Sequence, residues 1–161
     1  WLSVLEASDL VFLLPPYHRN FGKRLVKSSK LYFVDTGLVC WLLGIRNAET
    51  LCLHPLRGAV FETWVVGEFL KSRLNAGLPP DLYFWRDNNG LEADLVFEVD
   101  GRLQPVEIKS GSTVTPDYIR AGQKAARFAG EEALPPWLVH GGEDYYTRSG
   151  VKVVGWQSLE P

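Results

Sequence analysis

The spacing of apolar and polar residues predicts a chain in which helices and strands alternate. Residues 56–75 form the longest predicted helix, because apolar side chains recur on nearly every face and the run ends before Gly77. A helix that is apolar on more than one side is expected to lie buried between other elements. Thr115 and Pro116 supply a capping residue and a first-turn proline, which predict a second long helix over 116–129.

Short apolar runs bounded by turn residues predict strands. The predicted strands are 10–14, 31–34, 82–86, 91–98, 103–109, 137–140 and 151–156. Two shorter helices are predicted over 1–8 and 37–44, and the segments 45–55 and 141–150 are interpreted as connections. This order of elements is typical of an α/β fold in which helices cover a mixed sheet.

The dipeptide Asp100-Gly101 separates two of these strands and is a strong signal for a two-residue hairpin turn. With these residues as the loop, Asp94 lies directly opposite Glu107. Because side chains alternate across a strand, one face of the hairpin is predicted to be charged and the other buried. The charged face would carry Glu92, Asp94, Glu107 and Lys109, and the buried face Leu91, Ala93, Leu95 and Phe97.

The opposed carboxylates of Asp94 and Glu107 suggest a cation site. Their Cβ atoms are expected roughly 4.5–5.5 Å apart, where like charges repel unless a positive charge lies between them. Mg²⁺ is typically held by one or two carboxylates with water and phosphate oxygens. Lys109 would point into the same space. The alternative is a hairpin whose charged face is simply solvated.

Glu62 is a further candidate, because its carboxylate lies on an apolar stripe of the 56–75 helix and needs a partner or a metal there. The alternative for Glu62 is an ion pair with Arg73 or Arg86. Weaker candidates for the same site are Glu68, Glu92 and Gln123.

A basic loop between the first two predicted strands is a candidate for phosphate contact. Its cations are Arg19, Lys23, Arg24, Lys27 and Lys30, and residues 17–30 contain no acid. Helix, strand, basic loop and strand are the last elements of a winged helix, so residues 1–36 are interpreted as a winged-helix remnant and 37–161 as a second domain. The alternative is a solvated loop that faces another domain.

Composition and the absence of certain motifs narrow the classes of function that this chain could have. Lysine and arginine number 17 against 19 aspartates and glutamates, so overall charge does not indicate nucleic-acid binding. The sequence has no phosphate-binding loop of the ATPase type, hence no ATP site within it. No apolar run approaches the ~20 residues that span a bilayer, so no membrane association and a cytoplasmic location are predicted. A chain without methionine is expected to be a segment of a longer protein.

The order helix, three strands, helix, strand resembles the restriction-endonuclease-like PD-(D/E)xK fold with its αβββαβ core. Four motifs in this order are similar to the bacterial and archaeal DUF4143 family: KLYFVDTGL (30–38), GAVFETWVVGEF (58–69), FWRDNNGLEADLVF (84–97) and PVEIKSG (105–111). This resemblance implies that the region follows an AAA+ type ATPase domain and a winged helix, with the ATPase domain as a partner. Some nucleases of this fold carry a tyrosine four residues after the glutamine that corresponds to Gln123. This sequence has an arginine at that position, 127.

These observations favour a Mg²⁺- or Mn²⁺-dependent phosphodiesterase acting on DNA. Asp94 and Glu107 would bind the metal, Glu62 would complete the site, Lys109 would position the attacking water, and Arg86 would contact a phosphate. The alternative is a catalytically inactive nuclease-like domain that binds DNA or protein. A third possibility, an enzyme acting on small molecules, has little support because the sequence contains no cofactor fingerprint. The sequence leaves open whether the chain forms a homo-oligomer.

Overall fold

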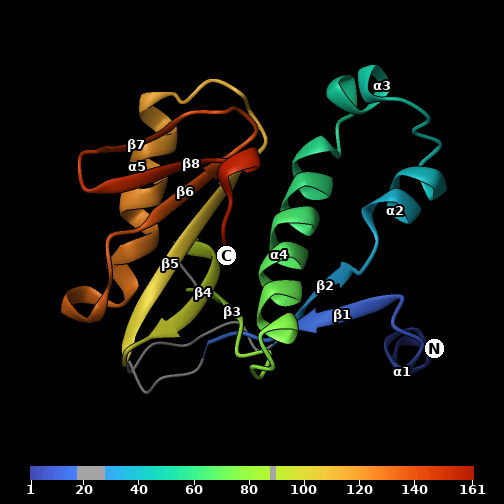
Figure 1. Cartoon of the computed structure of the whole chain (residues 1–161), viewed down its shortest axis with the longest axis horizontal. Helices are drawn as coiled ribbons and strands as arrows, with labels where there is room; N and C mark the ends of the chain where they lie inside the picture. Colours follow the sequence, from blue (N-terminus) through green and yellow to red (C-terminus); the bar gives the residue numbers. More distant parts are fainter. Residues whose placement is uncertain (18–27, 88–89) are drawn as a thin grey trace.

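A mixed β-sheet is the centre of the structure (Figure 1), a computed structural model that describes residues 1–17, 28–87 and 90–161. Within these residues the sheet has six strands in the order β3-β4-β5-β6-β8-β7. The strands are β3 (Tyr83–Arg86), β4 (Glu92–Val99), β5 (Arg102–Lys109), β6 (Trp137–His140), β7 (Tyr145–Arg148) and β8 (Val151–Gly155). The predicted α/β class with a mixed sheet is therefore confirmed.

The sheet combines an antiparallel half with a parallel half. β3, β4 and β5 form an antiparallel meander, whereas β5, β6 and β8 run parallel, and β7 returns antiparallel to β8. Parallel neighbours need a crossover connection, which helix α5 (Pro116–Ala125) supplies between β5 and β6. Thr115 caps α5 by accepting the Tyr118 backbone N–H, as the Thr-Pro signal predicts.

Helix α4 (Arg57–Asn75) and helix α5 cover opposite faces of the sheet (Figure 1). Val66 and Phe69 of α4 pack with Val106 and Val139 in one buried cluster. On the other face, the side chain of Ile119 in α5 lies in a separate buried cluster, whose other members are Leu138, Val151 and Val153. A fully buried side chain of this kind contributes about 1.5–3 kcal/mol relative to an exposed one, so the first cluster holds α4 and the second holds α5 against the sheet.

The N-terminal elements lie beside α4. They are α1 (Leu2–Ala7), β1 (Val11–Leu14), β2 (Lys30–Phe33), α2 (Thr36–Leu42) and α3 (Ala48–Leu53). β1 and β2 pair antiparallel, with Leu14 opposite Lys30. Leu14 and Tyr32 belong to the same buried cluster as Val66 of α4, so the two-stranded sheet is held against that helix.

The structure differs from the predicted elements at three places. Helix α3 lies in the predicted connection 45–55, where Asn47 caps it by accepting the Thr50 backbone N–H. Strand β7 lies in the predicted loop 141–150, and every one of its residues is exposed, so it carries no apolar signal. The helix predicted to reach residue 129 ends at Ala125 and continues as a short 3-10 turn over Ala126–Phe128.

The strands 82–86, 91–98 and 103–109 share one sheet, as predicted. The division between residues 36 and 37 stays a prediction. Among the helices of the described residues, none has the length and apolar character needed to cross a bilayer.

Candidate functional site

The predicted hairpin register is confirmed over most of its length. Residues from Leu95 opposite Val106 to Val99 opposite Arg102 pair as the Asp-Gly turn requires. The paired residues end at Leu95. Next to it, the Asp94 carboxylate accepts the Ile108 backbone N–H at 2.9 Å. Asp94 is thereby held between the two strands by a backbone bond.

A register shift in the β3–β4 pairing explains why alternation fails next to Asp94. Leu91 and Ala93 pack with Trp85 in one buried cluster, whereas Leu95 and Phe97 pack with the α4 cluster. The prediction that these four apolar residues share a face is therefore wrong. A bulge places an extra residue in one strand and redirects the side chains that follow it.

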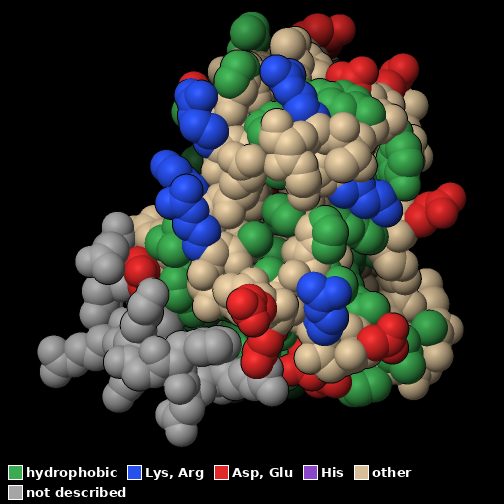
Figure 2. Space-filling view, turned by 90° about the vertical axis from the view of Figure 1, so that its left-hand side faces the viewer, with side chains coloured by type: hydrophobic (Ala, Val, Ile, Leu, Met, Phe, Trp, Pro, Cys, Tyr) green, Lys and Arg blue, Asp and Glu red, His purple; other side chains and the backbone are tan. Residues whose placement is uncertain are grey.

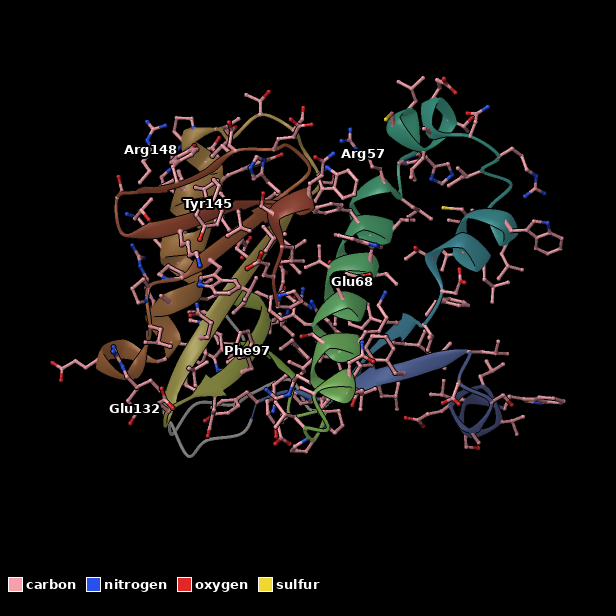
Figure 3. The ribbon with its side chains drawn as sticks, in the orientation of Figure 1. Arg57, Glu68, Phe97, Glu132, Tyr145 and Arg148 are labelled. Carbon is pink, nitrogen blue, oxygen red and sulfur yellow. The ribbon has the colours of Figure 1, made fainter. Side chains whose placement is uncertain are left out.

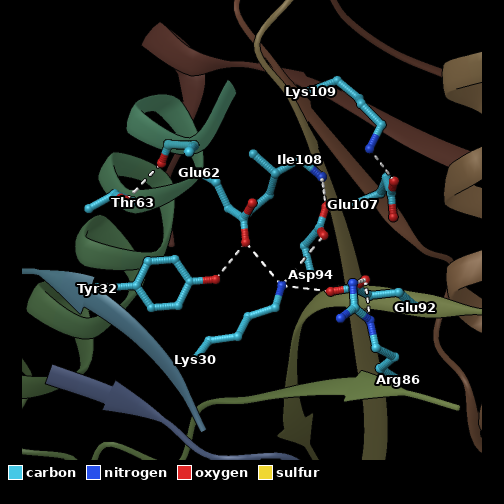
Figure 4. Close-up of polar contacts among 11 residues, drawn as sticks. Lys30, Tyr32, Glu62, Thr63, Arg86, Glu92, Asp94, Glu107, Ile108 and Lys109 are labelled. Carbon is cyan, nitrogen blue, oxygen red and sulfur yellow. Dashed lines mark hydrogen bonds and ion pairs between the residues drawn. The ribbon is translucent and has the colours of Figure 1, made fainter. Parts of the chain in front are cut away.

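Lys30 brings a positive charge among the carboxylates (Figure 4). Its Nζ lies 2.7 Å from a Glu92 oxygen, 3.1 Å from a Glu62 oxygen and 3.9 Å from an Asp94 oxygen. These four residues come from β2, α4 and β4, so the cluster exists only in the folded chain. Burial lowers the pKa of Lys30, but the three carboxylates outweigh it and raise the pKa overall.

Tyr32 lies two residues after Lys30 on β2, and its hydroxyl donates to the same Glu62 oxygen at 2.5 Å. Burial, followed by the charge of Glu62, raises the pKa of Tyr32, so the phenol stays protonated and acts as a donor. Glu62 is therefore held by two side chains of one strand, the Lys30 ammonium and the Tyr32 hydroxyl.

Two further ion pairs complete the cluster. Lys109 Nζ lies 2.5 Å from a Glu107 oxygen, and the Arg86 guanidinium contacts one Glu92 oxygen at 2.6 and 2.8 Å. Burial lowers the pKa of Lys109, but Glu107 and Asp94 outweigh it and raise the pKa overall. Burial raises the pKa of Glu107, although Lys109 opposes that shift.

Asp94 is the electrostatic centre of the cluster. Burial, together with the charges of Glu107 and Glu62, raises the pKa of Asp94 to about 7, although Lys109 and Lys30 oppose the shift. The four carboxylates of Glu62, Glu92, Asp94 and Glu107 and the three cations Lys30, Lys109 and Arg86 leave a formal charge of −1. One proton or one added cation would therefore offset the excess negative charge.

The carboxylate oxygens of this cluster are the type of ligand that a hard divalent cation prefers. Asp94 and Glu107 offer carboxylate oxygens, and Mg²⁺ or Mn²⁺ needs only one or two of these when waters and phosphate oxygens supply the rest. Within residues 1–17, 28–87 and 90–161, however, no three Asp, Glu, His or Cys side chains are arranged to enclose a metal ion. The ammonium of Lys30 lies on one side of Asp94, so Asp94 and Glu107 are the residues that would hold such an ion.

The alternatives raised for these residues do not hold. A solvated outer face is wrong for Asp94 and Glu107, whose side chains are 14% and 9% exposed. Glu62 pairs with Lys30, whereas Arg86 pairs with Glu92, and Arg73 pairs with Asp81.

Two of the weaker candidates lie apart from this cluster. Glu68 pairs with Lys71 on α4, the helix that begins at Arg57 (Figure 3). Gln123 is exposed and donates to the Ser149 backbone carbonyl. Glu92 is part of the cluster through Lys30 and Arg86.

Of the five basic residues of the loop that were predicted to contact phosphate, the structure describes one. Arg19, Lys23, Arg24 and Lys27 lie outside the described residues. Lys30 is described, and its ammonium is directed at carboxylates. On the face that Figure 2 shows, the Lys and Arg side chains of the described residues are interspersed with Asp and Glu and do not form a single patch.

Sequence reasoning missed the Lys30–Tyr32 contribution to the site. Lys30 and Tyr32 are two positions apart, so their side chains are expected on the same face of a strand, and the sequence alone indicates this. Their partner Glu62 is 32 residues from Lys30 along the chain, and no local pattern indicates that contact.

Comparison with known proteins identifies matching segments. Residues 57–159 match the family described as "Domain of unknown function (DUF4143)", and residues 1–49 match "Domain of unknown function (DUF8612)". Uncharacterized proteins of Mycobacterium bovis and Mycobacterium tuberculosis are each 40% identical over 114 residues. The match covers 70% of this chain and 25% of each relative, so the chain spans about a quarter of the length of these proteins.

Proposed function

This chain belongs to the DUF4143 family, and from that premise we propose that Asp94, Glu107 and Lys109 form the site of a Mg²⁺- or Mn²⁺-dependent DNA phosphodiesterase. The observation that carries the proposal is the position of Asp94, which lies buried between like charges with its pKa raised to about 7. Strongly perturbed carboxylates of this kind are concentrated at functional sites. The order α4-β3-β4-β5-α5-β6 supports a nuclease-like αβββαβ core, with residues 1–36 as a winged-helix remnant.

Asp94 and Glu107 would hold the metal ion, which would polarise a phosphoryl oxygen and lower the pKa of bound water. The Ile108 backbone N–H fixes the orientation of Asp94. Lys109 is held beside Glu107 as an ammonium, so it would donate to a phosphate oxygen and stabilise the charge that develops there. Arg86 would steady a second phosphate oxygen, because part of its side chain is exposed while Glu92 holds the guanidinium.

A cleavage assay on duplex and single-stranded DNA tests this proposal. Asp94→Asn and Lys109→Ala should each lower the cleavage rate by about 10² or more in Mn²⁺, since the first removes a ligand of the metal ion and the second a donor to the reacting phosphate. Glu68→Gln is the matched control, because Glu68 is a carboxylate of α4 that pairs outside the cluster.

The control should cleave at the wild-type rate, and a chelator should abolish cleavage by all variants. Cleavage that persists in chelator, or that survives Asp94→Asn unchanged, would contradict the proposal.

A second candidate is a non-catalytic nuclease-like module that binds DNA or protein. The observation that favours it is that three lysine and arginine side chains already neutralise most of the cluster. Under this candidate, the chain would bind DNA with no cleavage in either metal. The basic loop, including Arg19, Lys23, Arg24 and Lys27, would then make the phosphate contacts.

We also propose that the chain is a module of a longer AAA+ type ATPase. The curated relatives are about four times the length of the matched segment, which leaves room for such a domain.

A further inference from the structure

We propose that strand β7 is an interface through which two copies of this chain pair. β7 is one edge of the six-stranded sheet, and each of its residues is exposed. Antiparallel pairing of β7 with β7 of a second copy would join the two sheets into one continuous sheet with two-fold symmetry. This inference goes beyond the proposed function and does not depend on it.

The two edges of the sheet differ in how their backbone is covered. At the β3 edge, the Phe84 N–H donates to the Pro15 carbonyl at 3.1 Å, and the Phe84 carbonyl accepts the Tyr17 N–H at 2.7 Å. At the other edge, β8 is the one strand of the described residues that pairs with β7. An unpaired edge is a template for another chain unless Pro, Lys or a bulge protects it. β7 contains neither Pro nor Lys, and its pairing with β8 has no bulge.

The hydrogen bonds between β7 and β8 determine which backbone groups face the open edge. The Asp144 carbonyl accepts the Gly155 N–H at 2.8 Å, so these two residues form a hydrogen-bonded pair in the same register as the strands. Such pairs alternate along antiparallel strands, so Tyr146 also bonds to β8. Tyr145 and Thr147 therefore direct their N–H and C=O groups away from β8, toward the open edge.

This alternation restricts how β7 can pair with itself. A two-fold axis perpendicular to the sheet keeps each face on the same side in both copies, so the axis passes through a residue. With the axis at Tyr146, Tyr145 of each copy would exchange both backbone hydrogen bonds with Thr147 of the other. An axis at Thr147 would instead set Tyr145 opposite Ser149, whose φ of 52° belongs to a turn. An axis at Tyr145 would set the end of β7 opposite a bend at residues 141–142.

The side chains complement each other in the register centred on Tyr146. Asp144 would lie opposite Arg148 of the second copy, and the two-fold axis repeats this contact. Within one strand these two residues are four positions apart, roughly 13 Å, which is too far for an ion pair. Both side chains are exposed, and neither takes part in an ion pair among the described residues. The Tyr146 side chains would meet at the axis, where aromatic pairs stabilise a sheet.

The charges at the two ends of this segment specify its partner. Asp144 and Arg148 flank three uncharged residues, and Tyr145 and Arg148 mark the two ends of β7 in Figure 3. An antiparallel copy of the same segment brings each charge opposite its counterion, whereas a parallel copy would set like charges opposite each other. A second copy of this chain, in antiparallel orientation, is therefore the partner that the edge fits.

Sedimentation equilibrium of the whole chain at increasing concentration tests the inference. Wild type should form a dimer with twice the mass of the chain. Asp144→Arg sets cations opposite each other and should raise the dimer dissociation constant by about tenfold or more. Glu49→Arg is the matched control, because it changes the net charge equally at an exposed position of α3, far from β7 (Figure 1). It should keep the wild-type dissociation constant.

An exchange of the two charges identifies the contact. The double variant Asp144→Arg, Arg148→Asp restores an opposite charge at each pair, so its dissociation constant should return to within about threefold of wild type. Because the two residues are too far apart to pair within one strand, this recovery reports a contact between copies.

Thr147→Pro tests the backbone contact, since it removes an N–H at the open edge and leaves the bonds to β8 in place. This variant should be monomeric. Far-ultraviolet circular dichroism checks folding, and the charge variants decide the question if Thr147→Pro does not fold. A wild type that stays monomeric at millimolar concentration would overturn the inference. So would wild-type dimerisation of Asp144→Arg or of folded Thr147→Pro, or a double variant as weak as the single one.

Discussion

At the scale of single residues, Asp94 determines how the cluster responds to protons. Its pKa lies near 7 in the folded chain, against about 3.8 for the same group in an unfolded one. Between these values the folded state binds a proton that the unfolded state releases. The stabilisation that this proton contributes to the folded state is complete below about pH 4 and is lost as the pH rises toward 7.

The free energy of unfolding should therefore fall as the pH rises from 4 to 7 in metal-free buffer, with Asp94 contributing on the order of 1 kcal/mol per pH unit. Asp94→Asn should flatten this slope, because the amide has no charge and still offers an oxygen to the Ile108 N–H. Urea unfolding at several pH values in chelator measures both slopes. A variant less stable than wild type at pH 8 would mean that Lys30 and Lys109 need the Asp94 charge, contrary to this prediction.

At the scale of elements, the β1–β2 pair connects the N-terminal segment to α4. Tyr32 packs in the core cluster and also donates to Glu62, so it joins apolar packing to the charged cluster. Its hydroxyl is the part of this contact that can be removed without changing the ring.

Tyr32→Phe should lower the free energy of unfolding by about 1.5–3 kcal/mol, since it leaves the partly buried Glu62 carboxylate with one donor fewer. Tyr146→Phe is the control, because Tyr146 lies on the exposed strand β7 and should change stability by less than about 0.5 kcal/mol. Urea denaturation of both variants at pH 7 gives the comparison. Equal stability of Tyr32→Phe and wild type would show that the hydroxyl contributes nothing to the cluster.

The elements that the sequence predicts well are those with strong local signals. The Asp-Gly turn determined the hairpin register, and the Thr-Pro cap located the start of α5. β7 carries no apolar alternation because it is an exposed edge strand, and α3 is a short helix of six residues that Asn47 caps. The bulge beside Asp94 arises from pairing with β3, so local alternation gave the wrong face for Leu91 and Ala93.

At the scale of the whole molecule, the site depends on contacts between distant segments. The sequence identified Glu62, Asp94, Glu107 and Lys109 as candidates, and the structure describes all four in or beside one cluster. It did not identify Lys30 as the partner of Glu62, because that contact joins a strand to a helix across the fold. Charge patterns along a chain show which groups need partners but not which distant group meets the need.

The central claim is that the cluster at Asp94 takes a divalent cation. The most direct measurement is the melting temperature of wild type and of Asp94→Asn, each in chelator and in millimolar Mn²⁺ at pH 7.5. A ligand that binds only the native state at a hundred times its Kd stabilises it by about 2.7 kcal/mol, so wild type should melt several degrees higher in Mn²⁺. Asp94→Asn should show little shift. A wild-type melting temperature that Mn²⁺ leaves unchanged, or an equal shift in both proteins, would contradict the claim.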